Sequence, residues 1–81
     1  MPKLPSISGK ELIKLLTTIG FQSLRTRGSH VRLFAADGRK TSVPIHTGKT
    51  IPKGLLRKII REDLELKLEE FMQIYDAFRN N

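Results

Sequence analysis

The stretch H-V-R-L-F-A-A-D-G-R-K-T-S-V-P-I, residues 30–45, decides the fold. It holds two runs in which apolar and polar residues alternate, and this alternation is the period of a β-strand. Between the runs stands Asp37-Gly38, a pair typical of a tight hairpin turn. The sequence therefore predicts two antiparallel strands, His30–Ala35 and Lys40–Ile45.

A third strand is expected just upstream, over Phe21–Arg25, where the pattern is short and mixed. The three strands would form an antiparallel meander with one face on the core. Phe34 does not fit the alternation, because it shares a face with His30 and Arg32. We interpret its ring as a partner contact or as a partly exposed side chain.

A helix is predicted upstream of the strands, from Gly9 to Ile19. Ser8 and Glu11 have the spacing of a capping box, in which each side chain accepts a hydrogen bond from the other residue's backbone N–H. Gly20 follows at the position where a glycine commonly ends a helix. The apolar stripe of this helix consists of Leu12, Leu15, Leu16 and Ile19. Residues 1–7, which carry two prolines, are expected to be a loose lead-in.

Two further helices are predicted after the strands. Pro52 suits the first position of a helix, and an apolar stripe follows it at Leu55, Leu56, Ile59 and Ile60. The polar stretch 62–65 is expected to break this helix. The last helix would span Lys67–Phe78, with Leu68, Phe71, Met72 and Tyr75 turned inward. One bent helix from Pro52 to Phe78 is the alternative.

These elements predict an α+β fold with the order α-β-β-β-α and an added C-terminal helix. The helices would cover one face of a three-stranded antiparallel sheet and leave the other face open. The double-stranded-RNA-binding fold has the same order of elements. A chain of 81 residues is expected to be one domain over 1–81, with residues 63–81 as an acidic C-terminal helix region.

Charge is distributed unevenly along the chain, whose net charge is +7. Residues 1–61 hold 13 Lys and Arg against 2 Asp and Glu, whereas residues 62–81 hold 2 against 6. A basic body of this kind is expected to attract a polyanion, since its side chains replace the condensed counterions.

The composition also indicates a compartment. The chain has no cysteine, no apolar run of membrane-spanning length and no apolar segment of a signal peptide near its start. We therefore expect a soluble cytoplasmic protein without a membrane partner.

Few residues are available for chemistry. His30 and His46 are the two histidines, and Asp37 is the one acidic residue between Glu11 and Glu62. These are poor ligands for a metal site, and no phosphate-binding loop or nucleophile elbow is present, so we expect no cofactor. Metal-free cleavage of RNA remains possible, because RNA supplies its own nucleophile, the 2′-hydroxyl, and needs a base and cationic groups from the protein.

His30 is the candidate catalytic residue. A histidine at a strand start more commonly has a structural role, but here Gly28 and Ser29 come directly before His30. A glycine at this position lets a phosphate or a partner approach the ring closely. The candidate RNA-binding residues are Gly28, Ser29, Arg32, Lys49, Lys53 and Arg57. Lys53 and Arg57 belong to a row of cations spaced by four, which is either a solvated helix face or a track for phosphates. The group that protonates the leaving oxygen stays open among His46, a lysine and water.

The chain resembles toxins of the HicA type from HicA/HicB toxin–antitoxin pairs. The resemblance rests on Gly28-Ser29-His30, on Val43-Pro44-Ile45-His46 and on the stretch from Ile51 to Ile60, together with Ser8–Leu12 and Gly20-Phe21. It implies a double-stranded-RNA-binding-like fold, ribosome-independent cleavage of mRNA, a catalytic role for His30, and silencing by a HicB-type antitoxin that covers the active face. Residues 62–66 differ from the family, which usually has a glycine-containing link before the last helix.

Two other functions are weighed against the nuclease. A non-catalytic RNA-binding module would bind structured RNA through shape and phosphate contacts without cutting it. A toxin that has lost its activity would serve as a partner-binding subunit.

Overall fold

The structure is a computed structural model that describes residues 3–80. Its elements follow the order α-β-β-β-α with further helical segments, which confirms the α+β prediction. They are α1 (Gly9–Thr18), β1 (Phe21–Arg27), β2 (His30–Ala35), β3 (Lys40–Pro44), α2 (Lys53–Lys58), the π-helical segment η1 (Ile59–Asp63) and α3 (Leu68–Arg79).

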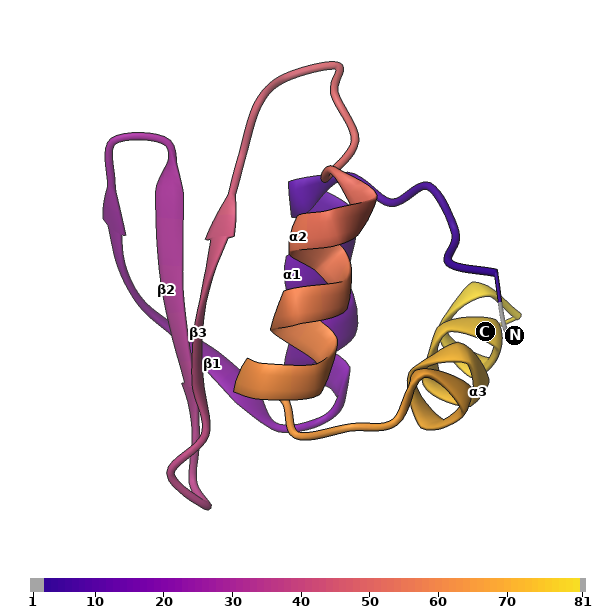
Figure 1. Cartoon of the computed structure of the whole chain (residues 1–81). Coiled ribbons are helices and arrows are strands. Elements are labelled where there is room, and N and C mark those ends of the chain that lie inside the picture. The colour runs from indigo at the N-terminus through magenta and orange to yellow at the C-terminus, as the bar shows by residue number, and fades with distance from the viewer. Residues whose placement is uncertain (1–2, 81) are drawn as a thin grey trace.

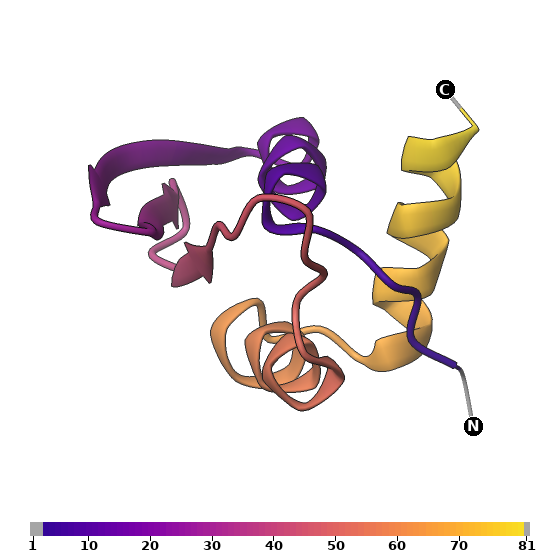
Figure 2. The same ribbon diagram turned by 90° about the horizontal axis from the view of Figure 1, so that it is seen from above.

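The three strands form one antiparallel sheet in the order β1-β2-β3. Both α1 and α2 lie on the same side of this sheet, and α3 lies beyond them, away from the strands (Figures 1 and 2). The helix α1 packs against β1 and β3, η1 packs against β3, and α3 packs against α1 and η1. The other face of the sheet, called the open face below, carries no helix of residues 3–80 (Figure 2).

Apolar side chains from every layer meet in one buried cluster. On β2, Val31, Leu33 and Ala35 are buried, so the strand alternates as predicted. Phe34 is half-buried on the open face, where it pairs with Gln22 and Lys40. The interpretation of Phe34 as a partly exposed ring is confirmed.

The start of α1 is held by the predicted capping box. The Ser8 hydroxyl accepts a hydrogen bond from the Glu11 backbone N–H, and the Glu11 carboxylate accepts one from the Ser8 backbone N–H. Gly20 has a φ of 103°, a left-handed conformation that glycine adopts without a steric penalty. The helix ends at Thr18, one residue before the predicted end.

Residues 3–7 are not the loose lead-in that the sequence predicts. Leu4 and Ile7 are buried in the core, and the Ile7 carbonyl accepts a hydrogen bond from the Ile51 backbone N–H. Residues 3–7 are therefore anchored, since two apolar side chains within them fill space between the helices. Residues 1–2 of the predicted lead-in lie outside the described residues.

Other strand and helix boundaries also differ from the prediction. β1 runs on to Arg27 rather than ending at Arg25, and β3 ends at Pro44 rather than Ile45. Pro52 precedes the first residue of α2 instead of occupying that position. Leu55 was expected inward but is 38% exposed, because it lies at the rim where α2 meets β3.

The break after the second helix is confirmed, and the single bent helix is wrong. The π-helical segment ends at Asp63, and α3 begins at Leu68. Glu65, in the link, has a φ of 56° and so takes the left-handed conformation that glycine usually supplies. The Glu70 carboxylate then accepts a hydrogen bond from the Lys67 backbone N–H at the start of α3.

This left-handed residue leads to a prediction on stability. Glu65→Gly removes the clash of a Cβ in that conformation, and Glu65 is exposed, so little else is lost. We expect a gain of about 0.5–1 kcal/mol after the extra freedom of glycine in the unfolded chain is counted. Thermal unfolding measures it. The control is Gln73→Gly, on the exposed side of α3, which should cost about 1 kcal/mol; a Glu65→Gly chain no more stable than the parent would contradict the prediction.

The turn between β2 and β3 fastens the sheet to the start of the link. Arg39 donates a hydrogen bond of 2.8 Å to the Leu64 carbonyl, and its guanidinium lies 5.2 Å from the centre of the Phe21 ring. The Thr41 hydroxyl donates to the Asp63 carboxylate at 2.9 Å. The Arg39 backbone N–H also bonds Asp37 and lowers the pKa of that carboxyl. These contacts fix the end of η1 against β3.

Candidate functional site

His30 is the first residue of β2 and follows a two-residue hairpin turn made of Gly28 and Ser29. Gly28 has a φ of 61°, which suits glycine in a tight hairpin. In the sheet, His30 pairs with Arg27 on one side and with Pro44 on the other. The side chain is exposed, so the ring is not part of the core.

The turn before His30 is also held from β3. The Ile45 backbone N–H donates a hydrogen bond of 2.6 Å to the Ser29 carbonyl, just past the last ladder pair of β2 and β3. Backbone on both sides therefore fixes where the His30 side chain leaves the sheet.

A β-bulge at Leu24 decides which side chains of β1 accompany His30. Ser23 pairs with Leu33, but Arg25 pairs with Arg32, so one extra residue is inserted between them. Such a bulge shifts the strand's alternation by one residue. As a result Arg25 lies beside Arg32 on the open face, and Arg27 lies beside His30.

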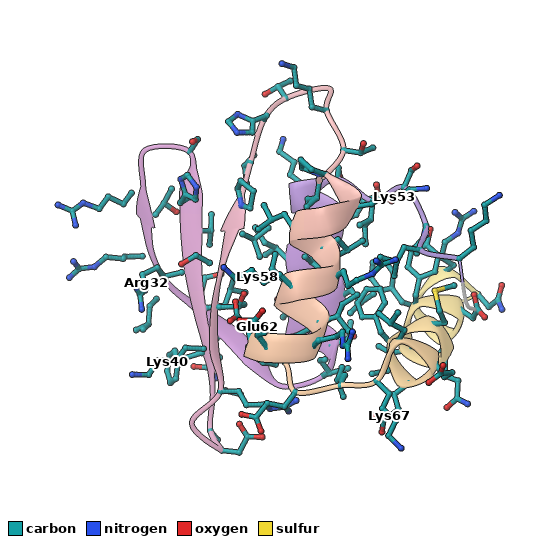
Figure 3. All side chains as sticks on the ribbon, in the orientation of Figure 1. Arg32, Lys40, Lys53, Lys58, Glu62 and Lys67 are labelled. Carbon is teal, nitrogen blue, oxygen red and sulfur yellow. The ribbon has the colours of Figure 1, made fainter. Side chains whose placement is uncertain are left out.

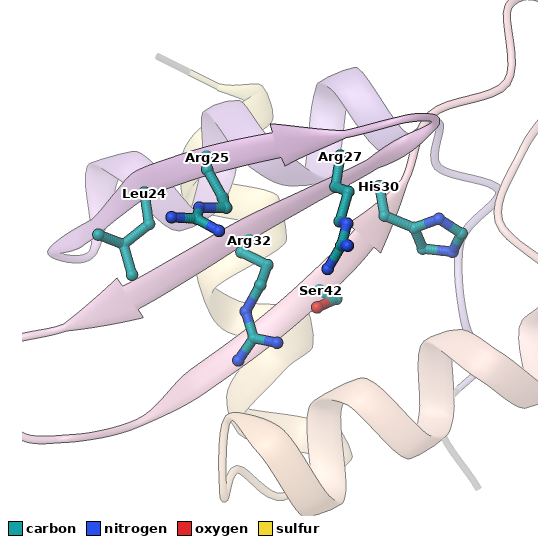
Figure 4. A pocket seen from close by; sticks show the side chains of 6 residues that line it. All are labelled: Leu24, Arg25, Arg27, His30, Arg32 and Ser42. Atoms are coloured by element: carbon teal, nitrogen blue, oxygen red, sulfur yellow. The ribbon is translucent and has the colours of Figure 1, made fainter.

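These residues line a hollow of about 560 Å³ on the open face, called the His30 hollow here (Figure 4). Its lining consists of Leu24, Arg25, Arg27, His30, Arg32 and Ser42. Among the described residues, no Asp or Glu belongs to this lining. Within residues 3–80 the single ion pair joins Arg39 to Asp37, so the three arginines of the hollow keep their charge unbalanced.

The structure brings together some of the predicted site residues and separates others. His30 and Arg32 share the hollow, and Gly28 and Ser29 form the turn at its edge. Lys49 is exposed in the loop between β3 and α2, and Lys53 is exposed at the start of α2 (Figure 3). Arg57 lines another hollow, on α2, with Gly54, Lys58, Arg61 and Glu62.

Arg25, Arg27 and Leu24 were missed as site residues by the sequence reasoning. The sequence predicts a first strand that ends at Arg25, and a strand of that length does not pair Arg27 with His30. The alternation Arg25-Thr26-Arg27 was the signal that could have found them, since it puts two arginines on one face of a strand.

His46 lies elsewhere. It lines a small hollow of about 100 Å³ between its loop and the start of α1, together with Ser8, Gly9 and Lys10. Among residues 3–80 no group of three or more His, Asp and Glu side chains is arranged to hold a metal ion.

The model of the HicA toxin of bacterial toxin–antitoxin systems matches residues 9–64, from the first residue of α1 to the residue after η1. The chain belongs to the HicA toxin family. No curated protein matches it.

Membership in the HicA family makes the chain the toxin of a toxin–antitoxin system, with an antitoxin as its partner. The matched residues contain the whole His30 hollow, whereas α3 lies outside them. In the part of the chain that the structure describes, no helix has the length and apolar character to cross a membrane.

Proposed function

We propose that this HicA-type chain is an endoribonuclease that cleaves mRNA without a metal ion. The observation that carries the proposal is the His30 hollow, in which an exposed imidazole lies among Arg25, Arg27 and Arg32. An imidazole can accept or donate a proton near neutral pH. The surrounding guanidinium groups attract a phosphodiester and favour the extra negative charge that it gains during cleavage.

The proposed reaction uses the substrate's own 2′-hydroxyl. The 2′-oxygen attacks the neighbouring phosphorus as its proton passes to a base, and the bond from phosphorus to the 5′-oxygen breaks as that oxygen gains a proton. The products are a 2′,3′-cyclic phosphate and a 5′-hydroxyl end. His30 acts as the general base or the general acid of this reaction. DNA lacks the nucleophile and is not cut by this route.

The neighbouring residues hold the strand in line. Arg32 contacts the phosphate beside His30, and the turn of Gly28 and Ser29 lets the backbone of the RNA approach the ring closely. Lys49, Lys53 and Arg57 remain proposed contacts to phosphates farther along the strand, outside the His30 hollow.

The antitoxin is proposed to be of the HicB type. A partner that covers the open face with acidic side chains would complement its arginines and lie over His30. It would block RNA by occupying the hollow, and the toxin would stay folded beneath it.

The alternative, a non-catalytic RNA-binding module, is favoured by the basic open face itself, which would bind RNA even without proton transfer. Purified protein incubated with labelled single-stranded RNA in EDTA separates the two functions. The nuclease gives product bands, and an added HicB-type protein suppresses them. A gel shift without products would reject the nuclease in favour of the binding module.

A further inference from the structure

A second hollow, of about 350 Å³, continues the His30 hollow towards α2. It is called the α2 hollow here, and it is lined by Arg32, Lys40, Thr41, Ser42, Leu55, Lys58, Ile59 and Asp63. Arg32 and Ser42 line both hollows, so the two meet on the open face. Figure 4 shows the Arg32 side chain extended from β2 towards β3, and Figure 3 shows Lys58 on α2.

The α2 hollow has the mixed chemistry that suits one nucleotide. Arg32, Lys40 and Lys58 supply three cations for a phosphate. Leu55, 38% exposed, offers an aliphatic surface to the face of a base. The carboxylate in the lining, Asp63, is engaged by the Thr41 hydroxyl at 2.9 Å.

This hollow is also built before any ligand arrives. The Thr41–Asp63 hydrogen bond and the bond from Arg39 to the Leu64 carbonyl tie the end of the helical segment to β3 and its turn. Leu55 and Lys58, about one to two turns before Asp63 on the same helical segment, are thereby held beside β3. A preformed site loses less conformational entropy when its ligand binds.

We infer that the α2 hollow is a second nucleotide subsite, which binds the nucleotide next to the one whose phosphate lies at His30. The inference rests on the proposed function, because the subsite would bind the same RNA strand that the nuclease cuts. The strand crosses the sheet from β1 to β3, a distance of about 10 Å for three strands, and continues onto α2. Lys58 contacts its phosphate and Leu55 contacts its base.

The test measures binding and not cleavage. The probe is a short single-stranded RNA oligonucleotide in which every 2′-hydroxyl is methylated, so that it cannot be cut by the proposed route. Lys58→Gln should weaken its binding about fivefold at about 0.1 M salt and lower the salt slope by about 0.7, the values for loss of one phosphate contact on a single strand. Lys14→Gln is the matched control, since it removes the same charge from an exposed position on α1.

Leu55→Ala separates the base from the phosphate. It should weaken binding of the methylated oligonucleotide and leave binding of an abasic version unchanged, whereas Lys58→Gln should weaken both. Equal affinities and salt slopes for Lys58→Gln and Lys14→Gln would overturn the subsite. So would a Lys58→Gln effect seen solely in binding of an acidic antitoxin, which would make the α2 hollow a protein contact.

The two proposals fail in different ways. If the chain binds the oligonucleotide through Lys58 and Leu55 but cuts no RNA, the nuclease is rejected and the subsite stands. If the chain cuts RNA and Lys58→Gln binds like Lys14→Gln, the subsite alone is rejected.

Discussion

Replacing His30 with alanine is expected to abolish most of the RNA cleavage, with a loss of about 10²–10⁴-fold in rate, the usual contribution of one proton-transferring side chain. The three arginines of the His30 hollow stay in place, so RNA should still bind. Cleavage of labelled RNA under single-turnover conditions measures the loss, and a gel shift measures the binding.

Two controls make this result interpretable. His30 is exposed, and surface substitutions usually change stability by less than about 0.5 kcal/mol, so thermal unfolding should be unchanged. His46→Ala removes the other imidazole, which lines a separate hollow, and should keep most of the activity. A His30→Ala protein that cuts RNA at the wild-type rate would reject the assignment of His30.

Gly9→Ala is expected to destabilise the fold by about 1–3 kcal/mol, the usual cost of overpacking. A Cβ on Gly9 would overlap the Pro44 carbonyl oxygen and would lie 3.2 Å from the Ile45 Cα. Those backbone atoms belong to the last residue of β3 and the residue after it, which cannot move without disturbing the core. Each kcal/mol should lower the melting temperature by about 4–8 °C in a domain of this size.

The same substitution should also reduce RNA cleavage, because Pro44 is the ladder partner of His30 and the Ile45 N–H bonds the Ser29 carbonyl. Gly54→Ala is the matched control: it lies in the first turn of α2, and its Cβ would meet no atom within 4 Å. It should stabilise the chain by about 0.5–1 kcal/mol. If Gly9→Ala were as stable as Gly54→Ala, the close approach of α1 to β3 would be refuted.

Local sequence signals predicted much of this fold. The capping box of Ser8 and Glu11 and the Asp37-Gly38 turn each depend on residues that are close together in the sequence. Their patterns can therefore be recognised without knowledge of the tertiary structure. β2 has the predicted bounds, since its inward and outward residues alternate without interruption. The end of the second helix was also predicted, although Glu65 rather than a glycine makes the left-handed turn there.

What the sequence did not predict depends on contacts between distant residues. The bulge at Leu24 breaks the alternation of β1, so the sequence shows that Arg25 and Arg27 share a face of the strand but not that this is the open face. Ile7 is buried, and its carbonyl accepts a hydrogen bond from the Ile51 backbone N–H. All three strands lie between these two residues in the sequence, so the sequence alone does not show the contact. The position of Leu55 follows from the way η1 is fastened to β3.

The residues chosen for the candidate site fall into two groups in the structure. His30, Arg32 and the turn before them could be chosen from residue type and spacing, and the structure places His30 and Arg32 in the lining of one hollow, with the turn directly before His30. Lys53 and Arg57 were grouped with them because their spacing of four makes one row on a helix. Spacing within a helix does not say which way that row faces, and the structure places it outside the His30 hollow.

The chemical identity of the product ends is the measurement that decides whether the substrate's own 2′-hydroxyl cuts the strand. Purified protein is incubated in EDTA with single-stranded RNA and with the same RNA carrying one 2′-deoxy nucleotide at the cleaved position. We expect 2′,3′-cyclic phosphate and 5′-hydroxyl ends from the first RNA and an intact bond at that position in the second. Cleavage at the deoxy position, or products ending in a 5′-phosphate, would contradict the mechanism.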